Sequence, residues 1–120
     1  MENLLPVTDA KAMVKTYLEN KSTVLKPEYL ELNVLSNTIT YGVDAFKNLV
    51  NNPKCAQIRM YFGMNEKLEI TGIFVGVDSE GNEILIEDQS MNKLDSAGFT
   101  VDEGTRCPPT CNNIEKSVLR

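Results

Sequence analysis

The fold is decided by the stretch QIRMYFGMNEKLEITGIFVGVDSEGNEILIE, residues 57 to 87. Polar and apolar side chains alternate along residues 57–62, and the runs 68–77 and 83–87 also have the composition of strands. Between these runs lie residues 63–67 and 78–82, which contain the turn formers Gly, Asn, Asp and Ser. We therefore predict three consecutive strands that pair as an antiparallel meander.

Helical spacing of apolar residues precedes the meander. In two segments, apolar side chains recur three and four residues apart, which predicts helices over about 8–20, capped by Thr8, and over about 43–52. The periodic residues are Ala10, Met13, Val14, Tyr17 and Leu18 in the first segment and Val43, Phe46, Leu49 and Val50 in the second. Pro27 indicates a short helical turn, and the β-branched run at 38–41 indicates a short strand.

A long polar stretch and a proline-containing tail follow the meander. Residues 88–105 predict a long acidic loop, and Pro108 and Pro109 restrict the backbone of the tail. A length of 120 residues with 42% hydrophobic content suits a single domain over residues 1–120. We predict an α+β fold: one or two helices packed on a face of a mostly antiparallel sheet of about four strands, with a long acidic loop and a Pro-stiffened C-terminal tail.

Charge and hydropathy limit the partners. The net charge is −5, and residues 78–103 hold eight acidic side chains against Lys93 alone. Because no stripe of basic residues is present, we expect neither nucleic acid nor a membrane surface as a partner. The longest apolar run is too short to span a bilayer, and the first ten residues lack the features of a secretory signal. We expect a soluble, cytoplasmic protein, with a secreted form whose signal has been removed as the alternative.

Histidine is absent from the whole chain. This removes the usual general base at neutral pH, the Ser-His and Cys-His nucleophile pairs and the most common ligand of transition metals. Glycine-rich phosphate loops and nucleophile elbows are also absent from the sequence. The composition therefore favours a non-enzymatic protein, and we expect no cofactor, no catalytic residues and no metal site. An enzyme that uses carboxylates of the acidic loop ranks last.

The sequence CPPTC, residues 107–111, places two of the three cysteines around two prolines. Three interpretations stay open. A disulfide joins Cys107 to Cys111, or joins one of them to Cys55. A zinc site uses the three thiols and completes its ligand set with a carboxylate or water. In the third interpretation, the cysteines pack as small hydrophobic residues beside a stiff tail.

Several of these motifs occur together elsewhere. The run from Gly42 to Asp78, with Cys55 before QIRMYFG and then GIFVGVDSEGNE, together with CPPTC, resembles a group of small uncharacterised bacterial proteins. These share an IR-aromatic-aromatic-G strand, a VGVD-x-x-GN hairpin and a terminal CPP-x-C. The resemblance covers the second helix, the meander and the tail, and Gln57 departs from the small residue expected there. It implies no activity, but it places Cys55, Cys107 and Cys111 at pattern positions.

Two functional hypotheses follow. In the strand 68–77, Ile73, Val75 and Val77 give one face an apolar half, which either an intramolecular element covers or a partner binds. The first hypothesis is a non-enzymatic protein-interaction or self-associating domain, with a protein partner or a homodimer at this face. The alternative is a redox or metal-binding thiol site made from Cys55, Cys107 and Cys111, with a tail cysteine in contact with the strand near Cys55.

Overall fold

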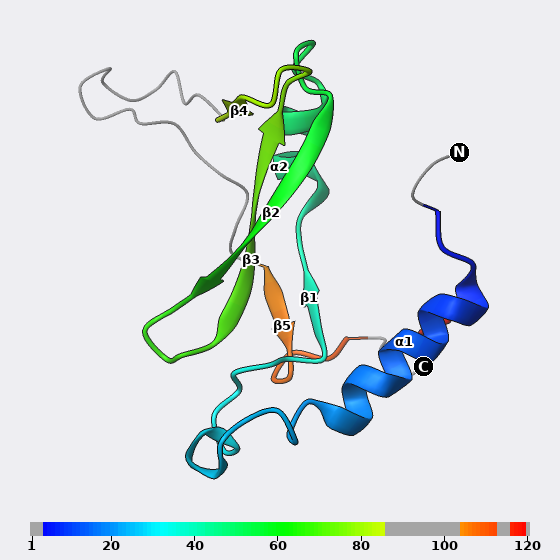
Figure 1. The fold of residues 1–120 in the computed structure, drawn as a ribbon, viewed down its shortest axis with the longest axis vertical. Helices are drawn as coiled ribbons and strands as arrows, with labels where there is room; N and C mark the ends of the chain where they lie inside the picture. Colours follow the sequence, from blue (N-terminus) through cyan, green and yellow to red (C-terminus); the bar gives the residue numbers. More distant parts are fainter. Residues whose placement is uncertain (1–3, 86–103, 113–115, 120) are drawn as a thin grey trace.

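The computed structural model describes residues 4–85, 104–112 and 116–119 and confirms the α+β class. Two helices and two antiparallel sheets make up the fold (Figure 1). In chain order the elements are α1 (Val7–Asn20), the 3-10 helix η1 (Pro27–Tyr29), β1 (Thr38–Thr40), α2 (Val43–Val50), β2 (Gln57–Met64), β3 (Ile70–Val77), β4 (Glu83–Ile84) and β5 (Thr105–Cys107). The acidic loop predicted over 88–105 lies almost wholly outside the described residues.

The predicted meander is confirmed as a three-stranded sheet in the order β2-β3-β4. Its register pairs Gln57 with Val77 and Met64 with Ile70, so that β2 and β3 form a regular hairpin. β3 begins at Ile70 instead of residue 68 because Leu68 has a positive φ of 64° inside the turn. Asn65 holds this turn, since its side-chain oxygen accepts hydrogen bonds from the backbone N–H groups of Lys67 and Glu69.

A second, two-stranded sheet joins β1 to β5, pairing Thr38 with Cys107 and Thr40 with Thr105. The short strand at 38–41 is thus confirmed, whereas β5 was not predicted. A strand of three residues is too short to show the alternation by which strands are recognised. The sheet of about four strands is therefore two separate sheets of three and two strands.

The two helices differ in how they are held. α2 packs on β3, where Phe46, Phe74 and Tyr41 make edge-to-face contacts with ring centroids 4.9–5.9 Å apart. Leu49 of α2 is 1% exposed and belongs to the small core. α1 buries no residue, and it follows Pro6, so the prediction that Thr8 caps it is wrong. Of the two helices, α2 is the one that packs on a sheet.

Polar contacts connect α1 to the rest of the protein. The Tyr17 hydroxyl donates to the Ser36 carbonyl at 2.5 Å, and the Lys21 ammonium donates to the Leu35 carbonyl at 3.2 Å and to the Asn37 side chain. Figure 1 shows α1 beside the β1–β5 sheet and away from the β2–β3 hairpin. α1 is therefore positioned by the segment 35–37 that precedes β1.

Arg106 of β5 links the two sheets. Its guanidinium donates to the Ile70 carbonyl at the start of β3 and, at 2.5 Å, to the Asn33 carbonyl, while its Nε lies 3.7 Å from Glu69 Oε2. The side chain of Arg106 is only 11% exposed and that of Glu69 18%. Because these charges are largely shielded from water, Arg106 depends on Glu69 and on the two carbonyl oxygens, and Glu69 depends on Arg106 and on the side-chain amide of Asn65, which donates to it at 2.8 Å.

We expect Arg106→Met to lower the free energy of unfolding by about 3 kcal/mol, because it leaves the Glu69 carboxylate without its cation and the half-buried carbonyl oxygens without a donor. Urea unfolding followed by circular dichroism measures the change. The matched control is Lys15→Met, which removes an exposed ion pair with Glu19 and should change the value by less than about 1 kcal/mol. Equal effects of the two variants would contradict the linking role of Arg106.

Candidate functional site

The apolar patch predicted as an interface is not an exposed surface. Val75 is 3% and Val77 2% exposed, and Ile73 is half-buried. The prediction that these three side chains are available to a partner is therefore wrong for Val75 and Val77. The intramolecular cover, which the sequence left open as the alternative, accounts for their burial.

A polar bridge on the same face provides part of this cover. Arg59 and Tyr61 of β2 lie opposite Val75 and Ile73, and Glu83 of β4 lies opposite Val77, so all of them share one sheet face. Arg59 Nη1 donates to Glu83 Oε2 at 2.9 Å, and the Tyr61 hydroxyl donates to the same oxygen. Since β3 lies between β2 and β4, these bonds cross over the two valines.

The bridge changes the acid–base properties of its members. The hydrogen bond from Tyr61, followed by that from Arg59, lowers the pKa of Glu83 below its usual value, because both donors stabilise the carboxylate. The pKa of Tyr61 is raised, chiefly by its hydrogen bond to Glu83. The folded state thus gains stability from ionised Glu83 above the unfolded-state pKa and loses it as the pH falls through the lowered folded-state pKa.

Tyr61→Phe is expected to raise the pKa of Glu83 toward its usual value, because one of the two donors to the carboxylate is removed. An NMR titration of the side-chain carboxyl carbon measures this pKa directly. Tyr29→Phe serves as the control, since it removes a phenol hydroxyl outside the bridge and should leave the titration unchanged. A Glu83 titration that is the same in Tyr61→Phe as in the parent protein would refute the bridge.

The three cysteines do not come together. Cys107 and Cys111 form a disulfide with Cα atoms 4.8 Å apart, while Cys55 is a free thiol. Cys55 packs against Gly76 near the end of β3, whereas Arg106, next to Cys107, binds the carbonyl of Ile70 at its start. Six residues of strand separate these points by about 20 Å. Of the pairings considered, the structure has Cys107 with Cys111, and the prediction of a tail cysteine in contact near Cys55 is wrong.

Thiol counting checks this arrangement. We expect native protein to contain one reactive thiol per chain, that of Cys55, and three after reduction and unfolding. The Cys55→Ser variant should contain none before reduction, because the other two sulfurs are bonded to each other. Detection of thiols in unreduced Cys55→Ser would show that the disulfide is absent.

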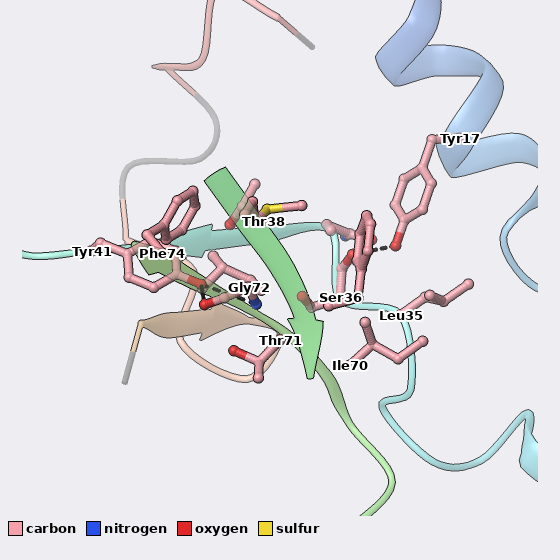
Figure 2. A pocket seen from close by; sticks show the side chains of 13 residues that line it. Tyr17, Leu35, Ser36, Thr38, Tyr41, Ile70, Thr71, Gly72 and Phe74 are labelled. Atoms are coloured by element: carbon pink, nitrogen blue, oxygen red, sulfur yellow. Dashed lines mark hydrogen bonds between the residues drawn. The ribbon is translucent and has the colours of Figure 1, made fainter. Parts of the chain in front are cut away.

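An apolar hollow of about 410 Å³ lies between the hairpin and the segment that leads into β1 (Figure 2). Its lining comes from α1, from residues 35–41 and from both strands of the hairpin. The lining residues are Tyr17, Leu35, Ser36, Asn37, Thr38, Ile39, Tyr41, Met60, Phe62, Ile70, Thr71, Gly72 and Phe74. This hollow is the candidate functional site, and no local pattern in the sequence indicated it.

Two tyrosine hydroxyls at the hollow have partners within the protein. The Tyr41 hydroxyl donates to the Gly72 carbonyl at 2.6 Å and accepts from the Gly72 N–H at 3.2 Å, as Figure 2 shows. The Tyr17 hydroxyl donates to Ser36, and burial raises the pKa of Tyr17 although nearby Arg106 opposes the shift. Both hydroxyls are therefore already hydrogen-bonded within the protein, which leaves a mainly apolar wall.

A row of exposed apolar side chains on β2 continues this wall. Alternate residues of a strand share a face, and here Ile58, Met60, Phe62 and Met64 are 44%, 43%, 79% and 57% exposed. Met60 and Phe62 also line the hollow. The alternation in QIRMYF predicted this row as one face of a strand, but the sequence could not indicate that the face is uncovered.

No protein-family model, curated protein or solved structure matches the chain. In the part of the chain that the structure describes, no group of three or more Cys, Asp or Glu side chains is arranged to hold a metal ion. Within that same part, no helix has the length and apolar character needed to cross a membrane. The geometry of the hollow and of β2 is therefore what bears on the function.

Proposed function

We propose that the protein is a non-enzymatic protein-interaction domain whose binding surface is the β2 row together with the hollow. The β2 row is defined as Ile58, Met60, Phe62 and Met64. The observation that supports this proposal best is Phe62, a large aromatic side chain that is 79% exposed at the border of an apolar hollow. Aromatic side chains beside a pocket are typical anchors of protein interfaces.

The chemistry of the hollow favours binding over catalysis. Its described lining contains no carboxylate, cysteine, lysine or arginine, and both of its tyrosine hydroxyls are hydrogen-bonded within the protein. A general acid or base needs a titratable group aimed at the substrate, and a nucleophile needs an adjacent base. An apolar hollow with an exposed aromatic border instead suits the side chains of a protein partner.

The proposed surface differs from the one that the sequence suggested. Val75 and Val77 lie under the Arg59–Glu83 bridge, whereas the β2 row occupies the opposite face of the same hairpin. Faces alternate with residue number along a strand, so the surface moves from the odd to the even positions of the hairpin. The class of function, a protein-interaction domain, is unchanged.

A photo-crosslinking amino acid at position 62 tests this proposal in cells that produce the protein. We expect one adduct of defined mass, because a specific partner contacts this position in a fixed way. The control places the same amino acid at Glu80, which is exposed in the turn between β3 and β4. If position 62 gives no adduct, or the same pattern as position 80, the β2 row is not an interaction surface.

A further inference from the structure

We propose that β2 pairs edge to edge and antiparallel with β2 of a second copy of the chain, which joins two three-stranded sheets into one of six strands. This inference rests on the proposed interaction surface and names its partner. In the order β2-β3-β4, β2 is an edge strand of eight residues. Strand addition at such an edge is a recurrent mode of protein association.

The outward backbone groups of β2 belong to the residues of the exposed row. Asn65 N–H donates to the Glu69 carbonyl at 3.1 Å, directly beyond the last register pair, Met64 with Ile70. Hydrogen-bonded pairs recur at every second residue of an antiparallel ladder, so Gly63, Tyr61 and Arg59 bond to β3. The N–H and C=O groups of Ile58, Met60 and Phe62 therefore point away from β3.

The other side of the hairpin confirms this direction. Ile70 and Gly72, which lie opposite Met64 and Phe62, turn their backbone groups away from β2. Ile70 N–H donates to the Val34 carbonyl at 2.9 Å, the Ile70 carbonyl accepts from Arg106, and both backbone groups of Gly72 bind the Tyr41 hydroxyl. Farther along, Gly76 and Val77 pair with β4. The outer edge of β3 is thus occupied where these groups lie.

Along the outer edge of β2, the described residues provide no such hydrogen-bond partners. Within residues 4–85, 104–112 and 116–119, no hydrogen bond is made to the outward groups of Ile58, Met60 or Phe62. Edge strands are usually protected from pairing by proline, lysine or a bulge along the strand. β2 contains no proline and no lysine, and its single charge, Arg59, is already bound to Glu83 on the opposite face.

The edge is complementary to itself. A two-fold axis at Met60 places Met60 against its own copy and Ile58 against Phe62 of the second copy, so apolar side chains meet on one face. The same register brings Arg59 against Tyr61 of the second copy and opposes no like charges. Pairing covers the outward backbone groups and the flanks of these side chains while their tips stay exposed, so the buried area is smaller than the roughly 800 Å² per partner of a standard interface and association depends on concentration.

Solution mass and amide exchange test the proposal on the full chain. Light scattering should give twice 13.4 kDa at high concentration and fall toward 13.4 kDa on dilution. Met60→Pro removes one outward N–H without breaking the ladder to β3, and Phe62→Lys places a charge in the apolar row, so each should weaken association at least tenfold. Val24→Lys is the control, since Val24 is 72% exposed in the segment between α1 and η1, and this variant should associate like the parent.

Hydrogen exchange on the unmodified chain provides a readout that requires no variant to fold. The amides of Ile58, Met60 and Phe62 should exchange at least tenfold more slowly at high than at low concentration, while those of Arg59 and Tyr61 stay protected in both conditions.

A chain that is monomeric at every concentration, or a dimer in which the amides of Ile58, Met60 and Phe62 exchange at the same rate at all concentrations, overturns the proposal. If an adduct to another protein still forms at position 62, the interaction function stands and only the second copy is refuted. A monomer without any adduct refutes both.

Discussion

The guanidinium of Arg106 joins two parts of the protein that no strand pairing connects. The described strands form two separate sheets, and Arg106 extends from β5 to the start of β3 and to the segment before β1. Because its side chain is 11% exposed, water cannot readily replace the protein groups that it binds. Together with the hydrogen bonds from Ile70 N–H to the Val34 carbonyl and between Tyr41 and Gly72, Arg106 sets the position of the β1–β5 sheet relative to the hairpin, and so the width of the hollow.

The way in which β3 is capped explains why a hollow exists. Arg106 satisfies the Ile70 carbonyl and Tyr41 both backbone groups of Gly72 with the tips of long side chains, while Ile70 N–H donates to the backbone of Val34. A strand would bring its backbone to about 4.8 Å from β3, whereas a side-chain cap keeps the backbones farther apart. The space between them is lined by apolar atoms of Ile70, Phe74 and Met60, and it opens toward the β2 row. The same capping leaves the outer edge of β2 as the edge available for pairing.

Local sequence patterns predicted the elements but not how they meet. The alternation in QIRMYF and the helical spacing around Phe46 and Leu49 are local properties, and the hairpin and α2 form where these patterns predict them. The cover over Val75 and Val77 depends on Arg59 and Glu83, which are 24 residues apart and meet across β3. The position of the disulfide likewise depends on the pairing of β5 with β1, for which three residues gave no pattern. The hollow is lined by residues from α1, from the segment 35–41 and from the hairpin, so it has no local signature in the sequence.

The small core connects the structure to the proposed pairing of β2. Among the described residues, the buried apolar side chains are Val34, Leu49, Val75, Val77 and Cys107, while the entire β2 row is exposed. Apolar burial is the main favourable term in folding, so a chain that leaves such a row exposed has only part of the available stabilisation. Pairing of two β2 edges would cover the flanks of the side chains in the row and satisfy the outward backbone groups in the same step. The folded state would then gain stability by mass action as the protein concentration rises, which links the assembly of the sheet to the stability of the domain.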